Sequence, residues 1–249
     1  MPDAMPTPAT PSPAAPPLAA AVEALIGPVF DSLEVLAEEV VACRSGHDTA
    51  PCTERSLSRL ESVIAPRLAA HPSLAGMGYV AAPGVVAGQD RYLLWWQRSG
   101  DDLARLRLNF DPSSIDVYDY LQMEWFQEAQ AGGARNAFGP YVDYSGSGLY
   151  VVTASVPVVI GRTFLGVAGA DIVMAHLERR LIAILRTCPT EAVVVNRERR
   201  VLAANTARWV VGARLSRVPR AGDGEFAEVA AVPDGPGWLV AVSDRPVAI

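Results

Sequence analysis

The order of two hydrophobic periodicities limits what this chain can fold into. Up to about residue 70, apolar residues recur every three or four positions, which predicts two helices over residues 18–43 and 54–68. Gly27-Pro28 is expected to kink or restart the first helix, and Thr53 is the predicted N-cap of the second. From residue 76 the pattern changes to short apolar runs separated by Gly and charged turns, which is typical of β-strands.

The strand-rich part predicts two sheets of unequal size. Three strands, a helix from about Ser114 to Ala131, two more strands and a helix that Asp171 caps and that ends near Arg186 indicate a five-stranded antiparallel sheet covered by helices, an α+β fold. The expected strands of this sheet lie at 76–86, 91–98, 103–110, 149–159 and 162–170. A hairpin at 191–205 and strands at 226–232 and 237–243 predict a smaller second sheet, with residues 244–249 as an unstructured end.

We therefore expect four regions along the chain. They are a disordered Pro/Ala-rich tail at 1–17, N-terminal helices at 18–70, a first sheet module at 71–186 and a smaller second module at 187–249. The tail has neither a positively charged start nor an apolar stretch, so it does not have the pattern of a secretory signal. No apolar run approaches the roughly 20 residues that cross a bilayer, and a cytoplasmic location without membrane contact is the expectation.

Charge and cysteine content exclude further classes of function. The formal net charge is -6 and no basic run is present, which argues against direct nucleic-acid binding. Three cysteines suit a reducing compartment. Cys43, His47 and Cys52 lie close in sequence, and a zinc site with Cys188 or His71, or a Cys43–Cys52 disulfide, stays open as an alternative; because the spacing matches no common zinc pattern, we expect neither metal nor cofactor.

One segment of about fifty residues resembles a known family. It begins at Trp125, which is followed by a second aromatic residue, and continues through GPYVD, the strand LYVVTASVPV and the strand FLGVAGADI. In order and spacing these features resemble the double Cache sensor family. The resemblance implies a long N-terminal helix followed by two PAS-like modules, with a small ligand bound in the first. Members of the family lie mostly outside the cytoplasm, between transmembrane helices, and this sequence shows no such helices and no output domain.

The resemblance also implies a ligand pocket between the first sheet and its covering helix. Aromatic residues on that helix and two aspartates at strand ends are expected to face one cavity. The expected ligand-binding residues are Tyr118, Met123, Trp125, Phe126, Tyr141, Asp143 and Asp171. Two carboxylates in a partly dry site repel each other, and an ammonium group would neutralise them. A plain core stripe through Tyr118 and Trp125, an N-cap role for Asp171 and a turn role for Asp143 are the competing interpretations.

Two departures from the family pattern bear on the ligand. The amino-acid-binding branch has an Arg two residues before the Trp, where this chain has Met123, and a Tyr after the Trp, where this chain has Phe126. Without the Arg, a ligand carboxylate has no partner at that position, so we expect a small amine or amino compound to bind better than an α-amino acid. Arg107 is the residue that we expect to replace the missing clamp if a carboxylate is bound after all.

An enzyme and a structural protein are the rival functions. No phosphate loop, nucleophile elbow or HExxH motif occurs, and the aspartates have no neighbouring nucleophile, so we expect no catalysis. The apolar face of residues 18–43 is long enough to pair with a second copy, which predicts a homodimer, although the same face would also cover the chain's own sheet. Signalling is expected to pass to a separate chain, such as a transcription regulator or a transporter component.

Overall fold

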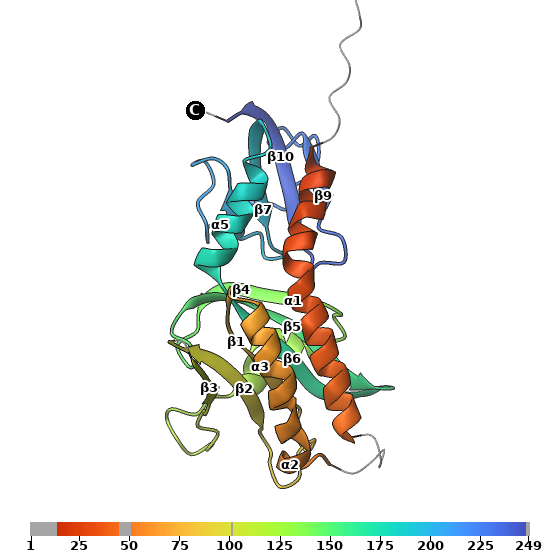
Figure 1. Ribbon diagram of the computed structural model, residues 1–249. Helices are drawn as coiled ribbons and strands as arrows, with labels where there is room; N and C mark the ends of the chain where they lie inside the picture. Colours follow the sequence, from red (N-terminus) through yellow and green to blue (C-terminus); the bar gives the residue numbers. More distant parts are fainter. Residues whose placement is uncertain (1–13, 45–50, 101, 248–249) are drawn as a thin grey trace, which may run out of the picture.

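A single long helix forms the spine of the protein. The computed structural model describes residues 14–44, 51–100 and 102–247. Helix α1 runs unbroken from Ala15 to Arg44, with Pro28 inside it, and lies along both halves of the molecule (Figure 1). It begins three residues earlier than predicted, so Pro16 and Pro17 belong to the helix and not to the tail. Proline is accepted there because the first N–H groups of a helix have no partner within it.

A second helical segment follows, as the sequence predicted. It consists of α2, the short 3-10 helix η1 and α3, with bounds Glu54–Leu57, Ser58–Leu60 and Glu61–Ala70. Thr53 is confirmed as the N-cap: its Oγ1 accepts the Ser56 N–H at 3.1 Å, while the Ser56 Oγ accepts the Thr53 N–H at 3.1 Å. This reciprocal pair satisfies two backbone donors at the start of the helix.

The first sheet has six antiparallel strands in the order β3-β2-β1-β6-β5-β4. Their bounds are Leu74–Ala81 for β1, Leu93–Ser99 for β2, Asp102–Leu106 for β3, Asn136–Val142 for β4, Tyr150–Ile160 for β5 and Thr163–Val173 for β6. The predicted count of five omitted β4, which carries a Gly-Pro pair. An edge strand tolerates that pair because one side of its backbone needs no ladder partner.

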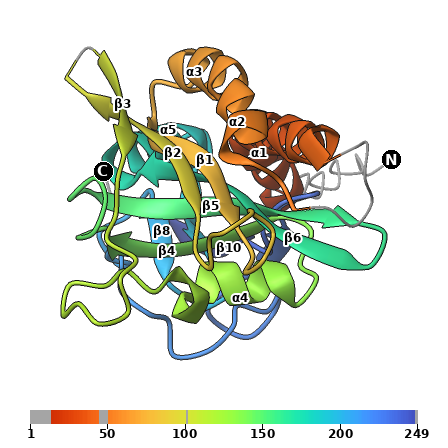
Figure 2. The ribbon, with the colours of Figure 1, turned by 90° about the horizontal axis from the view of Figure 1, so that it is seen from below.

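Helices cover the two faces of this sheet differently. Helices α1 to α3 lie on one face, and α4 (Glu124–Gln130) lies on the other, beside the short 3-10 helix η2 (Tyr120–Gln122) (Figure 2). The predicted helix from Ser114 to Ala131 is wrong in its first half. There the Ser114 Oγ accepts the Asp116 N–H at 3.3 Å and a bond from Asn109 Nδ2 at 2.8 Å, and such local side-chain bonds compete with helix formation.

The second module consists of a helix and four strands. Helix α5 spans Met174–Leu185, and the strands are β7 (Thr190–Val195), β8 (Val201–Ala204), β9 (Glu228–Ala231) and β10 (Leu239–Pro246), in the order β8-β7-β10-β9. Two predictions are corrected here. Asp171 lies inside β6 and does not cap α5, whose N-cap is Val173. Residues 244–246 belong to β10, because the second sheet continues to Pro246, which pairs with Thr190.

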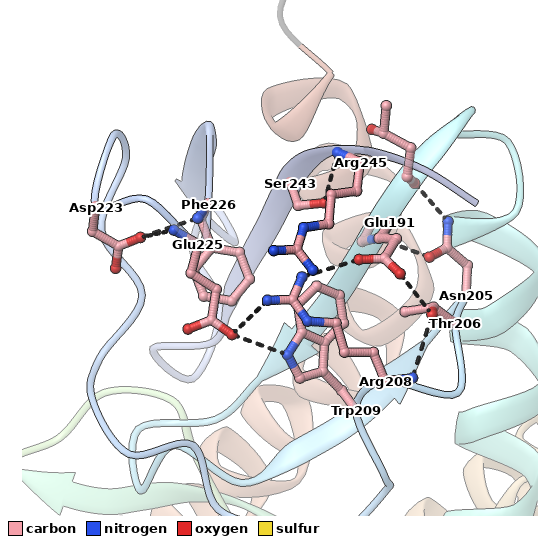
Figure 3. Close-up of polar contacts among 12 residues, drawn as sticks. Glu191, Asn205, Thr206, Arg208, Trp209, Asp223, Glu225, Phe226, Ser243 and Arg245 are labelled. Atoms are coloured by element: carbon pink, nitrogen blue, oxygen red, sulfur yellow. Dashed lines mark hydrogen bonds and ion pairs between the residues drawn. The ribbon is translucent and has the colours of Figure 1, made fainter. Parts of the chain in front are cut away.

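Side chains of an irregular segment, 205–227, pack on the second sheet, and Figure 3 shows the bonds that join Arg208 and Trp209 of this segment to Glu225. The rings of Trp209 and Phe226 from this segment stack with their centroids 5.4 Å apart. Both rings pack with Val193, Val195 and Val201 of the sheet. Arg208 holds the segment down because its guanidinium bonds Glu191 at 3.0 Å and Glu225 at 3.3 Å. The side chains of this segment therefore cover one face of the second sheet.

The apolar face of α1 is used within the chain. Its buried residues, which include Leu18, Val22, Ile26, Phe30, Leu33 and Val40, belong to the main hydrophobic core. The face that the sequence assigned to a dimer therefore packs against the chain's own sheets. Within the described ranges, no helix has the length and apolar character needed to span a membrane.

Candidate ligand-binding site

A cleft opens on the face of the first sheet that carries α4. Five of the seven residues expected at the site line it, from four separate parts of the chain. They are Tyr118, Trp125, Tyr141, Asp143 and Asp171. The remaining lining residues are Val80, Leu93, Trp95, Leu106, Leu108, Ser145, Gly146, Thr153 and Gly169.

Glycines in the central strands make room for the indole of Trp95, a lining residue. A Cβ at Gly76 would overlap the Trp95 Nε1, and a Cβ at Gly169 would lie 3.3 Å from the Trp95 ring. Gly78 faces the backbone of β2, where a Cβ would overlap the carbonyl oxygen of Leu94. The sheet therefore accepts a large aromatic ring flat against its surface at the floor of the cleft.

Asp171 is the most deeply placed charged group in the cleft. It lies in β6 directly opposite Thr153 of β5, and only 7% of its surface is exposed. Thr153 Oγ1 donates a hydrogen bond of 2.6 Å to Asp171 Oδ1. Because the single hydroxyl hydrogen of Thr153 is used in this bond, the 2.8 Å contact between Thr153 and Tyr141 has the Tyr141 hydroxyl as donor. A relay Tyr141–Thr153–Asp171 results.

Burial controls the protonation of Asp171. Desolvation, together with the negative charge of Asp143, raises the pKa of this carboxyl to about 7, although the Thr153 hydrogen bond acts to lower the pKa. Among the described residues Thr153 is the only hydrogen-bond donor to this carboxylate. The cleft thus holds a carboxylate that is only partly compensated and that would gain from a positively charged partner.

Asp143 has two roles, because it stabilises a turn and also lines the cleft. It follows β4 and accepts hydrogen bonds from the Gly146 N–H at 3.1 Å, the Ser147 N–H at 2.7 Å and the Ser147 Oγ at 3.1 Å. The turn interpretation is therefore correct, and the same carboxylate also lines the cleft. A ligand that contacts Asp143 would contact the turn 143–147 through it.

The aromatic walls come from different elements than expected. Tyr118 lies in the irregular stretch before η2 and Trp125 lies in α4, so they do not share a helix face. Burial, followed by the charges of Asp143 and Asp171, raises the pKa of the Tyr118 hydroxyl, which keeps it protonated as a potential donor. The described residues form no hydrogen bond with this hydroxyl.

Two predicted site residues lie away from the cleft lining. Phe126 is 1% exposed and packs its ring against Tyr120, Trp125 and Phe164, so it is part of the core. Met123 is the N-cap of α4, is 36% exposed and is absent from the lining. Arg107 lies on a neighbouring groove. No Arg or His is among the described residues that line the cleft, and its only charged lining groups are the two aspartates.

Two residues central to the site were not predicted from the sequence. Thr153 is a lone hydroxyl in the apolar run VVTASV, and its position opposite Asp171 follows from the strand register. Trp95 is the first of two adjacent tryptophans on β2, whose side chains point to opposite faces. A polar residue inside a buried strand is the signal that could have identified Thr153.

Cys43 and His71, which the sequence suggested as metal ligands, make other contacts in the structure. Cys43 Sγ contacts the Ser56 carbonyl oxygen at 3.3 Å and accepts a bond from Arg59 Nε at 3.1 Å. His71 Nε2 lies 2.9 Å from Ser32 Oγ. Cys43, Cys52 and Cys188 are free thiols. His47 lies outside the described residues, and the described ranges contain no group of three metal-ligating side chains.

Comparison with known proteins assigns this architecture. Residues 60–179, which include all six strands of the first sheet, match the family described as "Methyl-accepting chemotaxis protein-like, first PDC sensor domain". Similar solved structures cover nearly the whole chain, including the second sheet. Residues 60–179 therefore match a PDC sensor domain, and the chain as a whole has the double Cache fold. The matched family comprises non-catalytic sensor domains of chemoreceptors and histidine kinases, so residues 60–179 form a sensor domain and not a catalytic one.

Three solved structures illustrate the likeness of this Cache domain. The extracellular domain of the putative histidine kinase soHK1S-Z6 has a TM-score of 0.61 at 17% identity and covers 90% of this chain and 88% of its own. The ligand-binding domain of Campylobacter jejuni chemoreceptor Tlp3 with L-norvaline gives 0.58 at 13%, with 90% and 85% covered. That of Pseudomonas aeruginosa PAO1 PctC with GABA gives 0.56 at 18%, with 92% and 96% covered. No curated protein sequence matches the Cache chain significantly.

Proposed function

We propose that the cleft of the first module binds a small amine or amino compound and that the Cache domain reports its presence to a partner. The observation that carries this proposal is the charge of the cleft. Asp143 and Asp171 line it, and no cationic side chain is among its described lining residues. A site of this charge favours a positively charged ligand.

The physical reason lies in the cost of a buried carboxylate. Asp171 loses most of its hydration in the folded protein and has one hydrogen-bond donor. An ammonium group would add a charge-assisted hydrogen bond and remove the repulsion from Asp143. Trp95, Trp125 and Tyr118 would supply aromatic surface for the remainder of the ligand, and a ring face near an ammonium adds cation–π attraction.

The ligands of similar sensor structures support an amino compound. Tlp3 was determined with L-norvaline, and PctC with GABA. PctB of Pseudomonas aeruginosa PAO1, with a TM-score of 0.60 and 16% identity, was determined with L-Arg. Each of these molecules carries an amino group, which is the group that the two aspartates of this chain would recognise.

We further propose that amines bind better than the corresponding α-amino acids. A carboxylate that enters the cleft meets two aspartates and no cation, and burying it unpaired costs several kcal/mol. This preference follows from the charges of the lining residues. Met123, which stands at the family's arginine position, is a helix cap outside that lining.

Calorimetric titration with pairs that differ only by the carboxylate tests both statements. Isoamylamine against L-leucine and agmatine against L-arginine are suitable pairs, and the amine of each pair is expected to bind at least tenfold more tightly, a difference of about 1.4 kcal/mol. Asp171→Asn should weaken amine binding by a similar factor or more. Asp116→Asn, which removes the same charge from an exposed loop position, should leave it unchanged.

The results that would refute the proposal are specific. Tighter binding of the amino acid in each pair would reject the amine preference and leave the amino-compound class. Equal amine affinity in wild type and Asp171→Asn would reject the role of Asp171. If a broad panel of amines and amino acids produced neither heat nor a melting shift, the sensor assignment of this cleft would fail, because a ligand at 100 times its dissociation constant adds about 2.7 kcal/mol.

Assembly, partner and compartment complete the proposal. We propose a homodimer that uses surface other than the buried face of α1, and transmission of the signal to a separate chain such as a transcription regulator. Light scattering at micromolar concentration, with and without amine, tests the dimer, and a monomer under both conditions would remove it. The expected cytoplasmic location is tested by fractionating cells that express the native gene product.

A further inference from the structure

A second concave site lies beside the free edge of the first sheet. It is a groove next to β3, which is an edge strand. Its lining consists of Glu54, Gln89, Tyr92, Leu93, Arg105, Leu106, Arg107, Leu108 and Phe110. Arg105 lies in β3 and Arg107 follows the end of that strand, and both line the groove.

Both arginines of this groove lack an acidic partner. Arg105 Nη2 reaches the Tyr92 hydroxyl at 3.4 Å, and neither Arg105 nor Arg107 forms an ion pair with a described residue. Glu54 is the single acidic residue of the lining, and its Oε1 accepts a bond from Gln89 Nε2 at 3.0 Å. Two positive charges and one negative charge leave a net charge of +1 along the groove.

The groove also contains the polar side chains of Gln89 and Tyr92, and it adjoins the acidic cleft. Leu93, Leu106 and Leu108 line both concavities, so these leucines form the wall between an acidic site and a basic one. Phe110 adds an aromatic surface on the groove side. The groove thus presents guanidinium groups beside a short apolar surface, an arrangement suited to an anionic head with an aliphatic tail.

We propose that this groove binds a small monocarboxylate with a short aliphatic chain. Guanidinium groups match the two oxygens of a carboxylate with parallel hydrogen bonds. The net charge of +1 favours one negative charge over two, because Glu54 would repel the second. The leucines and Phe110 give the methylene groups an apolar surface to cover. The site does not depend on amine binding in the cleft.

Titration with butyrate, followed by NMR shifts of the folded Cache domain, tests this site. Butyrate should shift the amide resonances of β3 and of the segment around Phe110, and it should bind more tightly than acetate, which lacks the tail, and than inorganic phosphate, which carries up to two charges near neutral pH. Arg105→Gln combined with Arg107→Gln should weaken butyrate binding at least tenfold. Arg162→Gln removes the same charge at an exposed turn position outside the groove and should change nothing.

The proposal is overturned if the double variant binds butyrate as the wild type does, or if Arg162→Gln weakens it equally, which would indicate general surface charge. Equal affinities for butyrate, acetate and phosphate would also overturn it, because the tail and the single charge would then play no part. Butyrate and amines are titrated separately, so a failure of the groove is distinguishable from a failure of the cleft.

Discussion

Replacing Asp171 by Asn isolates the electrostatic cost of the cleft in the unliganded protein. The substitution removes an ionisable group and keeps a side-chain oxygen of similar size and position. That oxygen can still accept the Thr153 Oγ1–H, which donates to Asp171 at 2.6 Å. Because Asp171 lies within β6 and does not cap α5, no helix cap is lost. The change in stability therefore reports mainly on ionisation.

The raised pKa of Asp171 determines the sign and the size of this change in stability. In the unfolded chain the carboxyl ionises near 3.8, whereas in the folded protein it stays protonated up to a pKa of about 7. The folded state binds the proton more tightly, so the wild type loses stability as the pH rises from about 4 to about 7. The full cost above pH 7 is roughly 4 kcal/mol, and roughly 2–3 kcal/mol of it appears between pH 5 and pH 8.

Urea unfolding at pH 5 and pH 8 measures this effect. Asp171→Asn is expected to be more stable than the wild type at pH 8, and its advantage should grow by roughly 2–3 kcal/mol between the two pH values. Asp116→Asn serves as the control, since it changes the net charge equally at an exposed position. An advantage of Asp171→Asn that is the same at both pH values would refute the reasoning, because burial would then not disfavour the ionised form.

Three further predictions concern other parts of the structure. Amine affinity in the wild type should rise about tenfold between pH 6 and pH 8, since only ionised Asp171 pairs with an ammonium group; calorimetry that shows a flat profile contradicts this. Gly78→Ala should lower the free energy of unfolding by about 3 kcal/mol, because its Cβ would overlap the Leu94 carbonyl oxygen, and a cost under about 1 kcal/mol in urea unfolding would contradict the close strand approach. Arg135→Gln should cost about 1–2 kcal/mol and less in 1 M salt, because Arg135 bonds Asp31 and Glu34 at 2.8 Å each; an effect no larger than that of Arg162→Gln would contradict this.

Much of the fold follows from local sequence signals. The capping pair of Thr53 and Ser56, the helical spacing of α1 and the alternating strands around short turns are properties of neighbouring residues. The helix predicted from Ser114 failed because polar side chains such as Ser114 bond the backbone of nearby residues. Strand β4 was omitted because its Gly-Pro pair lowers strand propensity, and only its edge position makes that pair acceptable.

The candidate site could be predicted from the sequence in part, and the rest depends on the tertiary structure. Tyr118, Trp125, Tyr141, Asp143 and Asp171 were expected together from the family resemblance, and the structure places all five on one cleft. The apolar context of Phe126 does not distinguish a core position from a pocket position, because both are buried. Met123 lies at the motif position of a clamp, yet the chain enters α4 there, which turns its side chain to the surface.

The sequence by itself determined the helix and strand types, the two modules and the acidic character of the residues that meet at the cleft. Tertiary structure alone decided that Thr153 lies opposite Asp171, that glycines beneath Trp95 open the floor, and that Arg107 belongs to a separate groove. The reason is physical. Periodicity and capping depend on residues within a few positions of each other, whereas strand register, burial and the resulting pKa of Asp171 depend on segments brought together only when the sheet has formed.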